Sequence, residues 1–154
     1  MKRFLAPILL LTLLFPSFAM GETMDDLVVR DGLHFKKFSK VPFTGKTTGK
    51  SQGSFRNGKK HGPWVGYHKN GQLFYKGILK DRKRDGPWVF YHKNGQLWFK
   101  GTYKDGKGVG PWVDYHKSGQ LRSKGTLKDG KEVGPWVYNP KNGQSKPKPW
   151  WKIW

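Results

Sequence analysis

Apolar and polar positions form short runs that recur along most of the chain. Trp64 to His68 is a short run of residues that favour β-strands, and Leu73 to Lys80 is predicted to be the strand that returns beside it. Between them lies the segment Lys69-Asn70-Gly71-Gln72. An Asn-Gly pair between two strand-like runs favours a type I′ turn, which needs positive φ at both central residues. The pattern therefore predicts a β-hairpin.

This hairpin is repeated in tandem from Gly53 to Gly143. The motif Gly-Pro-Trp-Val begins at positions 62, 86, 110 and 134, a constant step of 24 residues. A fixed period of this length marks an array whose units bury their apolar faces on their neighbours. The sequence predicts an all-β fold, an elongated antiparallel meander of roughly seven to ten strands. Its packing layer is expected at Pro63, Trp64, Val65, Tyr67 and their copies.

A second turn joins each repeat to the next and differs in one copy. Three copies carry glycine at its second central position, as in Asn57-Gly58, whereas the copy at Asp81-Arg82 carries arginine. A non-glycine residue in the left-handed region costs about 1 to 2 kcal/mol. We expect this turn to be looser or differently shaped.

Composition and charge narrow the classes of function. The chain is 35% hydrophobic with 21 glycines, poor material for a deep globular core. Lysine and arginine number 30 against 10 acidic residues, so the formal net charge is +20 and a partner attracted over long range should be anionic. The absence of cysteine excludes disulfides, thiolate metal sites and thiol nucleophiles.

The regions outside the array have their own patterns. Residues 1–21 combine a basic start, an apolar run from Phe4 to Phe15 and small residues suited to cleavage, so they resemble a secretory signal peptide, expected to be helical. An uncleaved anchor is the alternative, but those residues span about 18 Å as a helix against a hydrocarbon core of about 30 Å. Residues 22–52 are predicted to be a leader and a degenerate N-terminal capping unit, and residues 144–154 a basic, tryptophan-rich tail.

The repeat resembles the bacterial variant of the MORN repeat, the membrane occupation and recognition nexus. The residues that carry the likeness are Gly53, Asn57-Gly58-Lys59, Gly62-Pro63-Trp64, Tyr67, Asn70-Gly71-Gln72-Leu73 and Lys76-Gly77. The resemblance covers four copies, the last truncated, and implies a β-hairpin array with a binding role and no catalytic residue. Relatives of this kind are commonly labelled antitoxins of toxin-antitoxin systems, and MORN arrays are associated with membrane attachment and protein scaffolding.

Lysines recur in two columns that are candidate ligand-binding positions. One occupies a turn position and the other a strand position, and the residues are Lys69, Lys93, Lys117 and Lys141, and Lys76, Lys100 and Lys124. Copies two strands apart lie about 10 Å from one another, close to the Debye length near 0.1 M salt, so each column predicts a continuous positive stripe. The alternative is a solvated face that keeps an aromatic sheet soluble.

The tail contains a third candidate site. Trp150, Trp151 and Trp154 alternate with lysines, a pattern suited to a membrane interface. The alternative is a cap in which a tryptophan folds over the open end of the sheet.

The remaining polar residues give no sign of catalysis or of a cofactor. His68, His92 and His116 recur once per repeat, but copies about 9.6 Å apart cannot share one metal ion, so they are interpreted as exposed strand-end residues. No nucleophile triad, phosphate loop or metal motif is present. We therefore expect no enzymatic activity and no cofactor.

These observations lead to one main hypothesis and one alternative. The first is an exported, non-enzymatic binding or scaffold protein, periplasmic or secreted, that contacts an anionic envelope component (lipid headgroups or glycans) or a protein partner. The alternative is an antitoxin that neutralises a protein toxin by direct binding. Nucleic acid is not expected as a partner, because export removes it from routine contact.

Overall fold

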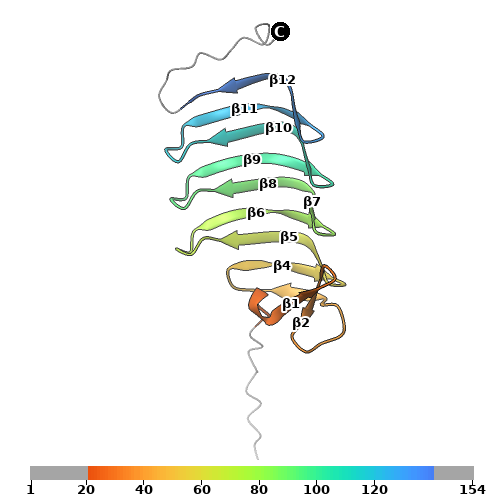
Figure 1. Ribbon diagram of the computed structural model, residues 1–154. Helices are drawn as coiled ribbons and strands as arrows, with labels where there is room; N and C mark the ends of the chain where they lie inside the picture. Colours follow the sequence, from red (N-terminus) through yellow and green to blue (C-terminus); the bar gives the residue numbers. More distant parts are fainter. Residues whose placement is uncertain (1–20, 141–154) are drawn as a thin grey trace, which may run out of the picture.

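The protein is a single long antiparallel sheet with a small hairpin against one end (Figure 1). A computed structural model describes residues 21–140. A short 3-10 helix, η1 (Met24–Asp26), comes first. The strands are β1 (Leu27–Arg30), β2 (Leu33–Lys36), β3 (Gly45–Thr47), β4 (Ser51–Arg56), β5 (Lys59–Tyr67), β6 (Leu73–Lys80), β7 (Lys83–Arg84), β8 (Gly86–Tyr91), β9 (Leu97–Lys104), β10 (Lys107–Tyr115), β11 (Leu121–Lys128) and β12 (Lys131–Tyr138).

The strands follow one another in space in the order of the chain. The large sheet has ten strands in the order β12-β11-β10-β9-β8-β6-β5-β4-β3, with β7 paired to β6. Every pairing is antiparallel, from β3 with β4 to β11 with β12. Local pairing of this kind follows from the short turns, because two antiparallel strands need only a tight connection. The predicted all-β meander of tandem hairpins is confirmed.

The turn within each repeat differs from the sequence-based prediction. Gly71 has a φ of 82°, but Asn70 has no positive φ, so this is not a type I′ turn. His68 N–H donates to the Gln72 carbonyl at 2.8 Å and Gly71 N–H to the His68 carbonyl at 3.0 Å, which describes a three-residue loop with glycine in the left-handed position. Ser118 can replace asparagine in the third copy because only the following glycine needs positive φ.

The turn between repeats is the type I′ turn. Asp105 and Gly106 have φ values of 50° and 85°, and Asp129 and Gly130 have values of 52° and 82°. The expectation that Asp81-Arg82 would differ in shape is wrong, since its φ values are 47° and 73°. Arg82 keeps the left-handed conformation while its N–H donates to the Lys60 carbonyl at 2.9 Å and its guanidinium donates to the Gly32 carbonyl.

The repeat tryptophans form the packing layer on one face of the sheet. The expectation that Pro63 and Val65 belong to this layer is wrong, because Pro63 is exposed and Val65 lies on the opposite face beside Lys76. Trp64 and Trp88 are 1% and 3% exposed, while Trp112 and Trp136 nearer the other end are half-buried. Each indole lies over a glycine of the preceding strand, and a Cβ added at Gly77 would lie 2.2 Å from Trp88 Cδ2. The glycines at 53, 77, 101 and 125 therefore recur because an indole occupies the space of their missing side chain.

Cationic side chains cover two of these indoles. Lys60 Nζ lies 4.4 Å from the ring centre of Trp64, and burial lowers the pKa of this amine. The Arg84 guanidinium lies 4.9 Å from Trp88 and donates to the Tyr103 hydroxyl at 2.8 Å. A one-layer sheet has no second sheet to exclude water, and these side chains shield the aromatic rings instead.

The first part of the chain packs against one end of the array. Hairpin β1–β2 lies in front of the first strands of the sheet (Figure 1). Met24 and Leu27 pack on the buried cluster of Phe43, Phe55 and Trp64.

Two predictions fall on residues that the structure does not describe. The signal peptide, residues 1–21, lies outside the described residues except for Gly21. The tail at residues 144–154, with Trp150, Trp151 and Trp154, also lies outside them, as does Lys141. These assignments remain predictions.

Candidate functional site: a lysine face and an aromatic groove

The strand lysines lie in one transverse row. Val65 pairs with Lys76, Lys76 with Val89, and the alternation continues through Lys100, Val113, Lys124 and Val137. The three lysines are exposed, whereas the valines between them are half-buried. Cross-strand partners share a face of the sheet, so the predicted column exists as a row with one lysine per repeat, about 9.6 Å apart.

The same face carries a second lysine row at the type I′ turns. Lys80 pairs with Lys83, Lys104 with Lys107, and Lys128 with Lys131, all of them exposed. Lys76 and Lys80 are four residues apart on one regular strand, as are Lys100 and Lys104, so both rows face the same way. We call these nine lysines the lysine face. None of them forms an ion pair with another residue of the described part of the chain.

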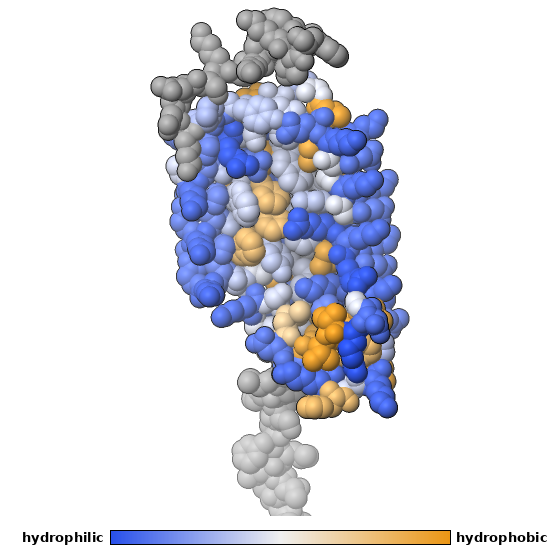
Figure 2. All heavy atoms as spheres, viewed as in Figure 1, coloured by the Kyte–Doolittle hydropathy of each residue, from blue (hydrophilic) through white to orange (hydrophobic). Residues whose placement is uncertain are grey.

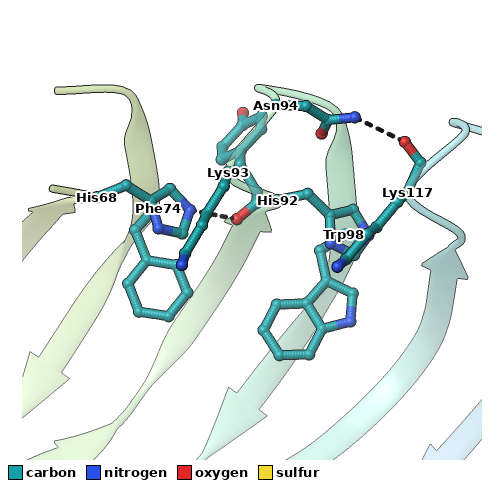
Figure 3. A pocket seen from close by; sticks show the side chains of 8 residues that line it. His68, Phe74, His92, Lys93, Asn94, Trp98 and Lys117 are labelled. Atoms are coloured by element: carbon teal, nitrogen blue, oxygen red, sulfur yellow. Dashed lines mark hydrogen bonds between the residues drawn. The ribbon is translucent and has the colours of Figure 1, made fainter. Parts of the chain in front are cut away.

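The turn lysines belong to a different surface. Lys93 and Lys117 line a groove of about 570 Å³ at the ends of the hairpins, together with aromatic and histidine side chains (Figure 3). The sequence shows this column and the strand column as candidate positions for the same kind of anionic ligand. The structure places Lys93 and Lys117 on a different surface from the lysine face. The groove lies on the tryptophan side of the sheet, where the ring centres of Phe74 and Phe90 are 5.8 Å apart. Lys69 is exposed at the equivalent turn of the preceding repeat.

The groove, which we call the aromatic groove, is built by two neighbouring repeats. Its lining residues are His68, Phe74, Tyr91, His92, Lys93, Asn94, Trp98 and Lys117. Figure 3 shows Phe74 and Trp98 pointing the same way from adjacent hairpins, with the amine ends of Lys93 and Lys117 beside them. In Figure 2 hydrophilic side chains follow both margins of the array, with paler and more apolar ones between.

A β-bulge places Phe74 on this side of the sheet. Gly66 pairs with Tyr75 and Tyr67 pairs with Leu73, so Phe74 has no partner in the ladder. The same shift between Phe90 and Tyr91 leaves Trp98 unpaired. A bulge lets two consecutive side chains lie on one face, and indeed both Phe74 and Tyr75 contact Phe90, at 5.8 and 5.7 Å.

The repeated histidines connect neighbouring repeats. Nε2 of His68 donates to the Tyr91 carbonyl at 2.9 Å, Nε2 of His92 to the Tyr115 carbonyl at 3.1 Å, and Nε2 of His116 to the Asn139 carbonyl at 2.7 Å. The interpretation of these histidines as simply exposed residues is therefore wrong, because His68 and His92 are half-buried and hold the next hairpin.

Two asparagines add a parallel contact at the hairpin tips. Asn70 Nδ2 donates to the Lys93 carbonyl, and Asn94 Nδ2 donates to the Lys117 carbonyl, both at 2.8 Å. In the third copy Ser118 stands in this position, and among residues 21–140 its hydroxyl contacts only the Gln120 N–H, at 3.5 Å. Each asparagine thus connects the tip of its own repeat to the tip of the next one.

We expect Asn94→Ala to lower the free energy of unfolding by about 1 kcal/mol, since it removes one intramolecular hydrogen bond between repeats. The matched control is Ser118→Ala, which removes no contact between repeats among residues 21–140 and should change stability by less than about 0.5 kcal/mol. Urea unfolding followed by circular dichroism measures both. Equal effects of the two substitutions would show that the asparagine contact contributes nothing.

Two further features were sought in the described residues, a metal site and a membrane-spanning helix. Over residues 21–140 no three histidine or acidic side chains are grouped closely enough to hold a metal ion. No helix in that same part of the chain has both the length and the hydropathy required to cross a membrane.

The architecture is that of a repeat protein: an open array of β-hairpins whose two faces offer extended surfaces to a partner. Comparison with protein families matches three stretches to the MORN repeat variant, at residues 60–81, 84–105 and 109–129. These three stretches are similar to MORN repeats, and such repeats in general suggest a binding or scaffolding role. A search of curated proteins found no match.

Sequence reasoning found the lysine row but missed the aromatic groove. The sequence signal that could have revealed the groove is a position whose residue type differs among the repeats. Phe74 and Trp98 occupy a position that is Lys50 one repeat earlier and Arg122 one repeat later. An aromatic residue at only two of four equivalent positions is not required by the fold, which makes it a candidate for another role.

Proposed function

We propose that this protein is an exported, non-enzymatic MORN-repeat scaffold that attaches to an anionic component of the cell envelope through the lysine face. The observation that carries the proposal is the row of Lys76, Lys100 and Lys124, exposed on one face at one lysine per repeat. A flat cationic row suits an extended anionic surface better than a small ligand, because it offers no enclosed pocket. The signal-like residues 1–21 support export.

Like charges placed directly opposite each other support this proposal. In the pairs Lys80–Lys83, Lys104–Lys107 and Lys128–Lys131, two lysines lie directly opposite each other on adjacent strands. Such cross-strand pairs are destabilising by roughly 0.2 to 1 kcal/mol each. An anionic partner on this face would relieve that repulsion, whereas solubility requires no such pairing.

The triple substitution of Lys76, Lys100 and Lys124 to Gln should weaken binding to vesicles of phosphatidylglycerol and phosphatidylcholine about 100-fold. The estimate follows from about 1 kcal/mol for each lysine near an anionic membrane and from tenfold in affinity per 1.4 kcal/mol. Vesicle co-sedimentation between 50 and 300 mM NaCl measures it, and the wild-type affinity should fall steeply with salt. An anionic glycan tested in parallel distinguishes lipid headgroups from sugars as the source of the charge.

The charge-matched control changes Lys69, Lys93 and Lys117 to Gln. It removes the same three charges from the hairpin tips, so a specific role of the lysine face predicts a clearly smaller loss of vesicle binding. Equal losses, or binding that does not depend on salt, would reject the proposal. Salt-resistant capture of one protein partner without vesicle binding would instead favour the alternative, neutralisation of a protein toxin by direct contact.

A further inference from the structure

The aromatic groove lies on the opposite side of the sheet from the lysine face, and its chemistry is different. We propose that the aromatic groove binds an acidic oligosaccharide, with sugar rings packed on Phe74 and Trp98 and carboxylates held by Lys93 and Lys117. This site does not depend on the role of the lysine face, because the two surfaces share no residue.

The two aromatic residues are not needed to build the sheet. The equivalent positions are Lys50 and Arg122, and both belong to hairpins that pair in the same antiparallel order. Both aromatic side chains are half-buried, in contrast with Trp88 and Phe90 of the packing layer, which are 3% and 5% exposed. The groove residues thus leave apolar ring surface in contact with solvent, although charged side chains fit the same position elsewhere in the array.

Histidines fix the orientation of these rings. His68 contacts Phe74 with ring centres 4.6 Å apart and planes tilted by 42°, and His92 stacks on Trp98 with ring centres 5.6 Å apart and an angle of 26° between the planes. Each imidazole is itself held by its hydrogen bond to the next repeat. The rings are therefore pre-organised, which reduces the entropy lost when a ligand binds.

The polar rim of the groove carries positive charge next to these rings. Lys93 and Lys117 are exposed, and Figure 3 shows each reaching from its own turn toward the aromatic ring of the preceding repeat. A flat apolar platform beside hydrogen-bond donors suits a sugar, which has apolar ring faces and polar edges. The ammonium groups add a preference for a sugar that carries a carboxylate.

The spacing of the two half-sites also fits such a polymer. Phe74 with Lys93 and Trp98 with Lys117 are one repeat apart, which is two strands or about 9.6 Å. This is close to the length of a disaccharide unit, and in a glycan with alternating uronic acids both the ring face and the carboxylate recur once per disaccharide. Stacked nucleotides recur at a much shorter interval, so a nucleic acid matches the groove less well.

Calorimetry with the full chain tests the proposal, using a hyaluronan hexasaccharide as the acidic probe and chitohexaose as its neutral counterpart. The wild-type protein should bind the acidic probe at least tenfold more tightly than the neutral one. Trp98→Ala and Phe74→Ala should each weaken binding of the acidic probe about tenfold, as expected for an aromatic anchor. Arg122→Ala, at the same repeat position outside the groove, is the matched control and should change affinity less than twofold.

The lysines provide a second, independent readout. Lys93→Gln with Lys117→Gln should remove the preference for the acidic probe while leaving chitohexaose binding unchanged. No binding of either sugar by the folded wild-type protein, or equal effects of Trp98→Ala and Arg122→Ala, would overturn the proposal. Tighter binding of oligothymidylate than of hyaluronan would also overturn it, in favour of a nucleic acid site. Loss of vesicle binding alone concerns the lysine face and leaves this result unaffected.

Discussion

Gly77→Ala is expected to lower the free energy of unfolding by about 3 kcal/mol, the upper part of the usual range for overpacking a core. The added Cβ would lie 2.2 Å from Cδ2 and 2.4 Å from Cε2 of Trp88. Trp88 cannot yield, because it is 3% exposed, its indole N–H donates to the Ile78 carbonyl at 2.9 Å, and Phe90 stacks on it at 5.6 Å. Urea unfolding monitored by tryptophan fluorescence and circular dichroism measures the change.

Gly110→Ala is the matched control for the glycine substitution. Gly110 has a φ of 71°, and a Cβ at this position would meet no atom within 4 Å, so only the backbone conformation is penalised. The expected loss is about 1 to 2 kcal/mol. If Gly77→Ala cost no more than Gly110→Ala, contact between the indole and the glycine would not be the reason for the repeated glycines.

The period of the sequence was sufficient to predict the fold. Glycine, proline and tryptophan recur every 24 residues, and a repeat of that length leaves room for two strands and two tight turns. The placement of Lys76, Lys100 and Lys124 in one row followed from the same period, because equivalent residues of stacked hairpins share a face. The fold and the lysine row could both be predicted because they depend only on the regular stacking of equivalent hairpins.

The aromatic groove could not be predicted by the same counting. Phe74 and Tyr75 are adjacent, and strict alternation along a strand places them on opposite faces. The bulge opposite Tyr67 brings both onto the tryptophan side. A single unpaired residue therefore changes the face of the sheet on which a side chain lies. The position of such a residue depends on the pairing register of the strands, which the period of the sequence does not specify.

The turns show a related limit of sequence reasoning. The Asn-Gly pair at Asn70-Gly71 favours a type I′ turn by local preference, but the structure adopts a three-residue loop there. The side chain of Asn70 is used instead to donate to the Lys93 carbonyl of the next repeat. A contact between repeats thus explains an asparagine that the local turn does not require.

Trp88→Ala is expected to cost about 3 to 5 kcal/mol, the usual range for truncating a buried tryptophan. The indole packs against Tyr75 and Phe90, with ring centres 5.8 and 5.6 Å away, and its removal also takes away one of the aromatic rings that the Arg84 guanidinium covers, at 4.9 Å. The Ile78 carbonyl would lose one of its two donors as well, keeping the Asp85 N–H. Urea unfolding of the full chain measures the loss.

Trp136→Ala is the matched comparison for Trp88→Ala, because Trp136 occupies the equivalent position in a later repeat. Trp136 is half-buried, its indole N–H lies 3.3 Å from the Thr126 carbonyl, and its described aromatic neighbour is Tyr138 at 6.0 Å. Less apolar surface returns to water when this side chain is removed, so the expected loss is about 1 to 2 kcal/mol. In a one-layer array an indole is buried mainly by its neighbours in adjacent repeats, and a central tryptophan has them on both sides. Equal losses for the two variants would show that burial by adjacent repeats does not determine the stability of this sheet.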